Sequence, residues 1–366
     1  MSESLPDSLP DWRKRLQIPG LVFASLGIVV AGFVIYARLT APSYAEVLRG
    51  QVKRARPAAS AFDLTRLSIP RSEVHSGGPP KDGIPALNDP ETVAADKAFF
   101  LLPSDPVIGV AIEGQLRAYP LEVMDYHEIV NDTIGRVPIA VTYCPLCDSA
   151  AVFDRRLGGR TVELGVSGLL YNSNVLMFDR AEEGKESLWS QMAARAVSGE
   201  SLGESLRSLP LEVCSWESWR ERFPETTVLS HDTGHLRKYD RSGYAPYFAS
   251  SGLMFPVTPI DDRLTEKRKV LGVRVGEKSR AYAYTEGGTP EKRSEALGGF
   301  EFDLVVDPRS GAPRVENPPE ELTVVYSYWF AWSAFYPETE LVDLDPPAVG
   351  HLEPAVGRVV GEEVVD

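Results

Sequence analysis

Two sequence patterns that occur twice limit what this chain can fold into. The first is a VxGV run followed by Arg-Ala-Tyr at residues 107–119, and it returns with the same internal spacing at residues 270–282. The second is a WxxWxxx(F/Y)PET pattern that starts at Trp216 and returns at Trp329. Because both patterns keep their order, we interpret them as a degenerate internal repeat. The second copy is shorter, since it lacks the segment that carries a Cys-x-x-Cys motif.

Short apolar runs broken by turn residues predict the secondary structure. The pairs Glu113-Gly114 and Gly158-Gly159 each lie between two such runs, a pattern typical of β-hairpins. Helical periodicity is weak and confined to residues 91–101 and 215–222. We therefore predict a mainly β (α+β) fold. It would be an antiparallel β-rich globular domain with the internal repeat and a few short helices, behind one N-terminal transmembrane helix.

That transmembrane helix is expected from residues 18–37, which contain no charged residue. Twenty residues in a helix span about 30 Å, the thickness of a bilayer core. Basic residues at 13–15 place the N-terminal tail in the cytoplasm and the bulk of the chain outside, in the periplasm or at the cell surface. A cleaved signal peptide with residues 43–45 as its processing site, or a buried helix, are the alternatives.

The composition then suggests the following organisation. The segments are a cytoplasmic tail (1–17), a transmembrane anchor or signal-anchor (18–37), a stalk (38–69), a β-rich domain (70–345) with lobe one at about 107–229 and lobe two at about 270–342, and an acidic disordered tail (346–366). The membrane is thus one expected partner.

Several classes of ligand are not expected. The net charge is −14, and no stripe of Lys and Arg interleaves with aromatic residues, so we predict no nucleic-acid partner. No phosphate-cradling glycine loop is present, so no nucleotide is expected. Cys147 is followed by Asp148 rather than by His, which excludes a c-type haem attachment motif.

Six ordered motifs resemble one family. They are GGPPKDGIP at 77–85, HEIVND at 127–132, TYCPLC at 142–147, GVSGLLYNS at 165–173, Asp179-Arg180, and SLWSQ at 187–191. The chain looks like a member of the bacterial and archaeal family of unknown function DUF3179, over about residues 70–342. The resemblance implies an exported or membrane-attached protein and carries no agreed activity. Cys214, His231 and His235 look particular to this chain and are weaker candidates for a shared function.

The Cys-x-x-Cys motif holds two of the three cysteines in the chain, Cys144 and Cys147, and directly follows a predicted strand at 139–142. Two thiols at this spacing can chelate a soft metal ion such as copper or zinc, cycle as a redox pair, or close a structural disulfide. In an oxidising compartment the disulfide is a strong alternative.

Histidines could complete a metal site. His127 lies 17 residues before Cys144 and could be a third ligand, with Met177, Asp148 or water as the fourth, or else a buried or capping histidine. His231 and His235 form a weaker ligand pair, because turn-forming residues lie between them.

These observations leave three hypotheses open. In the first, a membrane-anchored extracytoplasmic protein binds copper or zinc through Cys144, Cys147 and His127, as a metal carrier or a metal-dependent redox protein. In the second, the same cysteines act as a metal-free thiol–disulfide redox pair. In the third, the protein is a binding or scaffold module with a structural disulfide. The sequence alone does not choose among them, nor does it decide whether the protein is an enzyme.

Overall fold

The computed structural model describes residues 58–285, 291–307 and 309–345. The expected cytoplasmic tail, transmembrane anchor and acidic tail, and residues 38–57 of the expected stalk, lie outside these residues. Within the described ranges, no helix is both long and apolar enough to cross a membrane. Residues 58–69 pack against the globular unit, where Leu67 pairs with Ser198 and Leu64 is buried in an apolar cluster.

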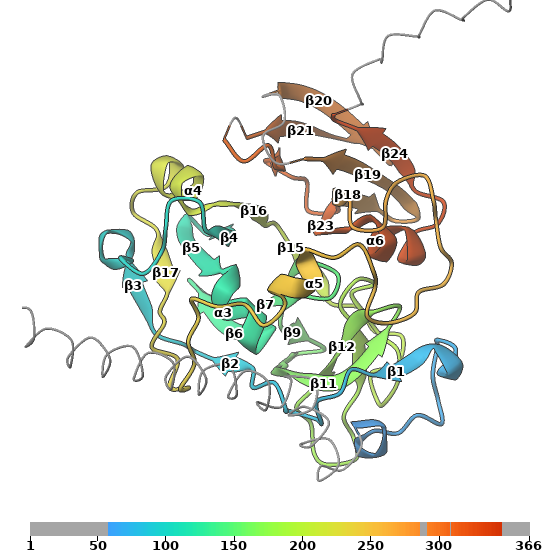
Figure 1. Cartoon of the computed structure of the whole chain (residues 1–366). Helices are drawn as coiled ribbons and strands as arrows, with labels where there is room; N and C mark the ends of the chain where they lie inside the picture. The colour runs from blue at the N-terminus through green and yellow to red at the C-terminus, as the bar shows by residue number, and fades with distance from the viewer. Residues whose placement is uncertain (1–57, 286–290, 308, 346–366) are drawn as a thin grey trace, which may run out of the picture. The chain divides into compact units, whose positions relative to one another are not determined.

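The largest sheet in the described part of the chain has nine strands (Figure 1). Their order is β2 (Leu87–Asn88), β6 (Ile129–Ile134), β7 (Val137–Cys144), β8 (Ser149–Asp154), β23 (Thr323–Tyr328), β18 (Lys269–Val275), β19 (Lys278–Tyr284) and β24 (Glu340–Asp343), with β15 (Arg207–Leu209) paired to β8.

Two five-stranded sheets and two smaller ones complete the strands described. One five-stranded sheet has the order β16 (Glu212–Ser215), β4 (Pro106–Ile112), β5 (Gln115–Pro120), β17 (Thr227–Leu229) and β3 (Thr92–Ala94). The other has the order β1 (Val74–Ser76), β11 (Leu164–Tyr171), β12 (Asn174–Asp179), β13 (Leu188–Ser190) and β14 (Arg195–Ala196). The smaller sheets are β20 (Glu291–Leu297), β21 (Phe300–Val306) and β22 (Pro313–Glu316), and β9 (Arg156–Leu157) with β10 (Arg160–Thr161).

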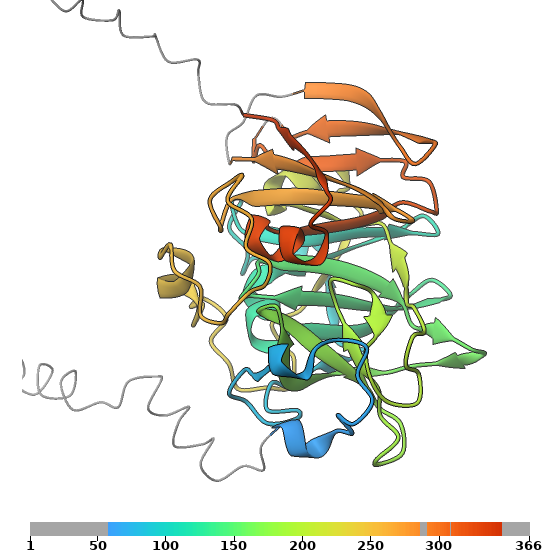
Figure 2. The ribbon, with the colours of Figure 1, turned by 90° about the vertical axis from the view of Figure 1, so that its right-hand side faces the viewer.

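The helices are short. They are α3 (Leu121–His127), α4 (Trp216–Arg222), α5 (Ala245–Phe248) and α6 (Trp329–Phe335), with 3-10 turns η2 (Ala58–Ala61), η3 (Arg71–Glu73) and η4 (Ala95–Lys97). Figure 2 shows the strands stacked in layers, and the segment that carries α5, coloured gold, standing out on one side. The predicted mainly β fold with a few short helices is therefore confirmed for the described residues.

Of the elements predicted individually, a hairpin and a helix are confirmed and another helix was wrong. Strands β4 and β5 form the expected hairpin around Glu113-Gly114, and α4 confirms the helix expected at 215–222. The helix expected at 91–101 was wrong, since this segment holds strand β3 and only the 3-10 turn η4. Residues 92–94 pair with β17 and are therefore extended, because tertiary contacts override a weak helix propensity.

The internal repeat corresponds to a repeated arrangement of strands. In the first copy, hairpin β4–β5 lies between antiparallel β16 and parallel β17, with α4 joining the two outer strands. In the second copy, hairpin β18–β19 lies between antiparallel β23 and parallel β24, with α6 joining them. The two sequence patterns therefore encode one supersecondary unit built twice.

A glycine–tryptophan contact closes each copy. A Cβ atom added to Gly109 would lie 2.3 Å from the Trp219 ring, and one added to Gly272 would lie 2.2 Å from the Trp332 ring. The ring nitrogen of Trp219 donates to Thr226 Oγ1 at 2.9 Å, as that of Trp332 does to its equivalent threonine at 3.0 Å. The helix can therefore approach the hairpin only where the strand has no side chain.

We predict that Gly109→Ala and Gly272→Ala each lower the free energy of unfolding by roughly 1–3 kcal/mol, because the added methyl group overlaps a fully buried indole that has no room to move. Urea denaturation of both variants measures this. Gly252→Ala is the matched control, since its added Cβ meets nothing within 4 Å and should leave stability nearly unchanged. Equal stability of the Gly109→Ala, Gly272→Ala and Gly252→Ala variants would contradict the packing argument.

Candidate functional site

The Cys-x-x-Cys motif forms the turn between two strands of the large sheet. Strand β7 ends at Cys144, β8 begins at Ser149, and these two residues pair across the hairpin. The amide of Cys147 donates to the carbonyl of Cys144 at 3.1 Å, and Asp148 takes a positive φ of 46° to close the turn. The thiols are thus held by a rigid hairpin, with no helix following them.

Both cysteines are unbridged and buried, at 1% and 0% exposure for Cys144 and Cys147. Their sulfur atoms meet one carbonyl oxygen, that of Ser173, at 3.9 Å from Cys144 and 3.2 Å from Cys147. Ser173 and the preceding Asn172 form the tip of the β11–β12 hairpin, and both have positive φ angles, 63° and 48°. A strained turn of non-glycine residues therefore aims its carbonyl group at the pair of thiols.

The surroundings shift the pKa values of the two thiols in opposite directions. Burial opposes ionisation of Cys144, but hydrogen bonds from the Cys147 thiol and from the amides of Val175, Cys147 and Leu146 outweigh it and lower the pKa of Cys144. Burial and the neighbouring Cys144 raise the pKa of Cys147 well above its usual range. Of the two thiols, Cys144 therefore ionises more readily, as suits a nucleophile, and Cys147 ionises less readily, as suits a resolving thiol.

A buried network of polar side chains fixes the hairpin next to that turn. The side chain of Gln191 donates to Thr142 Oγ1 at 3.0 Å and accepts from Ser149 Oγ at 2.7 Å and from Asn174 Nδ2 at 2.8 Å. All four residues are almost fully buried. Since Asn174 follows Ser173 in the chain, this network couples the position of the Ser173 carbonyl to the hairpin that carries the thiols.

A long segment with little regular structure, residues 230–268, covers the cysteines. Tyr247 in α5 donates its hydroxyl to the carbonyl of Leu146, between the cysteines, at 2.7 Å. Lys267 Nζ lies 3.4 Å from the centre of the Tyr247 ring. Ser173 Oγ donates to the carbonyl of Phe255 at 3.2 Å. Because the thiols themselves have almost no exposed surface, a reactant can reach the sulfur atoms only after residues that cover them move.

The structure does not direct His127 at the cysteines. This residue ends α3 and is fully buried, with Nδ1 2.7 Å from the carbonyl oxygen of Pro85 and Nε2 2.7 Å from the hydroxyl of Tyr239. Burial, followed by the charges of His235 and Arg237, lowers its pKa to about 4, although the contact with Pro85 acts in the opposite direction. His127 is therefore a neutral histidine whose two nitrogens are both engaged by the protein.

The residue after it, Glu128, is the one linked to the thiols. Glu128 has a φ of 56°, its carbonyl accepts from the amide of Tyr143 at 2.7 Å, and it is buried. Burial, then the charges of Cys144 and Asp125, raise the pKa of Glu128 well above its usual range. The surroundings thus favour the protonated form of its carboxyl group over the ionised form.

The remaining predicted ligands lie apart or are engaged elsewhere. Met177 is fully buried in β12, opposite Trp189. Asp148 accepts from the Tyr143 hydroxyl at 2.7 Å. The Nε2 atom of His231 lies 2.6 Å from Glu122, and the centre of the His235 ring lies 5.1 Å from that of His127, with the two rings tilted by 52°. In the described part of the chain, no three His, Cys, Asp or Glu side chains are grouped to hold a metal ion.

Comparison with known proteins gives one match. The family model described as "Protein of unknown function (DUF3179)" matches residues 81–318, which is more than half of the chain, and the chain belongs to this family. This confirms the resemblance read from the motifs. No curated protein and no solved structure matches.

We predict that replacing His127 changes how stability depends on pH. The folded state holds this group with a pKa of about 4, below the ordinary 6.5, so the folded state binds its proton less readily than the unfolded state. Its contribution to stability is fully present above pH 6.5 and is lost as the pH falls from 6.5 to about 4. Urea denaturation across this range should therefore show a shallower decline in His127→Gln than in wild type.

The matched control is His75→Gln, because His75 lies in β1 and is only half-buried. The stability of His75→Gln should fall with decreasing pH as steeply as that of wild type. An identical pH dependence in wild type and His127→Gln would contradict a buried neutral His127.

Proposed function

We propose, because membership of this family carries no activity, that the protein is a thiol–disulfide redox protein in which Cys144 is the nucleophile and Cys147 the resolving thiol. One observation carries this proposal. The two thiols share one buried turn, in which hydrogen bonds lower the pKa of Cys144 while burial and the neighbouring Cys144 raise that of Cys147. This is the second of the three hypotheses raised by the sequence.

The chemistry takes place in two exchange steps with a disulfide substrate. The Cys144 thiolate attacks one sulfur atom of the substrate, the substrate S–S bond breaks, and one substrate thiolate leaves. Cys147 then gives up its proton and its sulfur attacks Cys144 Sγ, so that the Cys144–Cys147 disulfide forms and the second substrate thiolate leaves. Protein and substrate exchange two electrons, and the reverse sequence oxidises a dithiol. We propose the buried Glu128, whose pKa is raised in part by the charge of Cys144, as the group that donates a proton to the first leaving thiolate and accepts the one from Cys147.

The location that we propose is the one expected from the sequence. An anchor at residues 18–37 would hold the domain on the extracytoplasmic side of a membrane, in a compartment where disulfides form and exchange.

A soft metal ion is the second candidate reactant for the same thiols. The position of both cysteines in one turn favours it, because two adjacent thiols, once deprotonated, are a suitable donor set for Cu(I). This candidate would use Cys144 and Cys147 without His127, whose nitrogens contact Pro85 and Tyr239 instead.

We predict that the two cysteines differ in a trapping experiment with oxidised glutathione. Cys147→Ser should accumulate a mixed disulfide at Cys144, because no second thiol is present to resolve it. Cys144→Ser should form at least about ten-fold less, since the remaining thiol has a raised pKa. Mass spectrometry of the intact protein measures both adducts, and Cys214→Ser is the control that should behave as wild type.

Equal trapping in the two single variants would contradict the assigned roles. The metal candidate is measured on the same samples. About one copper or zinc ion per chain in wild type, lost in Cys144→Ser and accompanied by no mixed disulfide in Cys147→Ser, would replace the redox proposal with a metal site.

A further inference from the structure

A large cavity lies beside the cysteine turn without containing the thiols. Its volume is about 840 Å³, within the range of sites for small organic ligands. Helix α3, the turn after Cys147, strands β16 and β23, and the segment 309–312 surround it. Asp148 and Tyr143, which flank the Cys-x-x-Cys motif, both line this cavity, whereas the two cysteines do not.

Aromatic rings form much of its wall. The cavity is lined by five aromatic side chains, which are Tyr143, Tyr284, Tyr326, Tyr328 and Phe248. The hydroxyl groups of two of them are directed to the protein, Tyr143 to Asp148 and Tyr326 to the carbonyl of Pro313, both at 2.7 Å. Ring faces attract a positive charge through their quadrupole, so such a wall suits a cation that also has an apolar part.

The charged lining has a negative excess. It contains five carboxylates, of Asp105, Glu122, Asp125, Asp148 and Glu217, and only two cationic side chains, Lys269 and Arg309. Arg309 pairs with Glu217 at 2.9 Å, and Lys269 lies 3.7 Å from Asp148. The carboxylates that these two cations do not pair are Asp105, Glu122 and Asp125. The last two lie on α3, where Glu122 also contacts His231 Nε2 at 2.6 Å.

Asp125 lies among these carboxylates. It is buried, and its pKa is raised to about 7, first by burial and then by the charges of Asp148 and Glu122, while a hydrogen bond from Ser242 acts in the opposite direction. A cation in the cavity would offset that repulsion and stabilise the ionised carboxylate.

A polar group without a partner lines the same cavity. Ser327 in β23 is 2% exposed, and its Oγ makes no hydrogen bond in the described structure. A buried hydroxyl left unsatisfied costs free energy, on the order of 1–3 kcal/mol. A ligand with a donor or acceptor group at this position would recover that cost.

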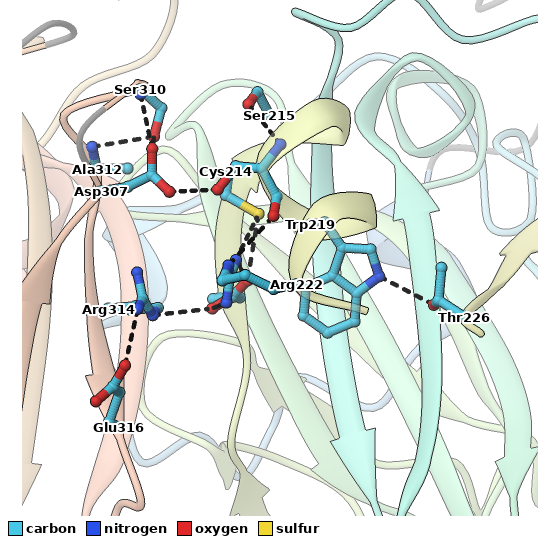
Figure 3. A network of polar contacts seen from close by, with 12 residues as sticks. Cys214, Ser215, Trp219, Arg222, Thr226, Asp307, Ser310, Ala312, Arg314 and Glu316 are labelled. Atoms are coloured by element: carbon cyan, nitrogen blue, oxygen red, sulfur yellow. Dashed lines mark hydrogen bonds and ion pairs between the residues drawn. The ribbon is translucent and has the colours of Figure 1, made fainter. Parts of the chain in front are cut away.

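Cys214, Ser215 and Ser310 line the cavity and belong to the polar network in Figure 3. Asp307 accepts from the amides of Arg309 and Ser310 at 2.9 Å and from the Ser218 hydroxyl of α4. Glu212 pairs with Arg222 nearby. These contacts join α4 of the first copy to the segment around Asp307 and so fix one side of the cavity.

We propose that this cavity binds an organic cation, an amine or quaternary ammonium compound, with its charge beside Asp125 and Glu122 and its apolar part against the tyrosine rings. A bare metal ion would leave most of the volume empty and would not use the aromatic wall. The proposal is independent of the thiol chemistry, because Cys144 and Cys147 do not line the cavity.

Isothermal titration calorimetry of the full-length protein at pH 8 tests it, with choline and benzylamine as cationic probes. Their neutral counterparts, 3,3-dimethylbutan-1-ol and benzyl alcohol, have nearly the same shape without the charge. At least one cation should bind about ten-fold or more tightly than its counterpart, the effect of one well-placed charge. The proposal is overturned if neither cation binds more tightly than its neutral counterpart.

Two variants locate the binding. Asp125→Asn should weaken binding of the cation about ten-fold and leave that of the neutral probe unchanged, whereas Asp96→Asn, on the exposed turn η4, should alter neither. Ser327→Ala should not lower the melting temperature, because its hydroxyl has no hydrogen bond to lose and is costly to bury, and should weaken cation binding several-fold. Wild-type affinity in both Asp125→Asn and Ser327→Ala would place the cation elsewhere and contradict the inference.

Discussion

The candidate site depends on one contact, in which the strained tip of the β11–β12 hairpin meets the turn between β7 and β8. The Ser173 carbonyl lies against both sulfur atoms, and the buried Gln191 network holds the two hairpins in that position. A positive φ at two successive non-glycine residues costs free energy, and such strain persists only where the surroundings over-determine it. Here the strained turn lies where a backbone acceptor and several amide donors contact the two thiols.

The duplication explains where that contact is built. Each copy of the repeat is a hairpin between two outer strands, closed by a tryptophan that packs on a glycine. The first copy contains an insertion that includes β6, β7 and β8, and these strands extend the sheet of the second copy through the pairing of Ala150 with Tyr326. The cysteine hairpin is thus shared between the two copies, and the cavity lies beside it where residues of both copies meet.

Much of the fold could be predicted from the sequence, because its signals are local. The Glu113-Gly114 turn, the helix at Trp216 and the repeated Gly and Trp positions each follow from a few neighbouring residues. The site could be predicted only in part. The spacing of Cys144 and Cys147 indicated soft-metal or redox chemistry, but the use of both His127 nitrogens by Pro85 and Tyr239 depends on segments far apart in the sequence. The contact of Ser173 with the thiols and the burial of Glu128 also arise from tertiary packing, which neighbouring residues in the sequence do not indicate. For the Ser173 contact, the sequence offers only a polar run, Asn172-Ser173-Asn174, as an indication.

The central claim is that Cys144 and Cys147 exchange electrons reversibly, and a redox titration tests it most directly. The full-length protein would be equilibrated in dithiol–disulfide buffers of stepped potential, and its reduced and oxidised forms counted by mass after thiol alkylation. The account predicts a single two-electron transition at a midpoint between about −270 and −120 mV, the range of proteins that exchange disulfides. A pair that stays oxidised below about −300 mV would be a structural disulfide, and a pair that never forms a disulfide would have no redox role; either result would contradict the account.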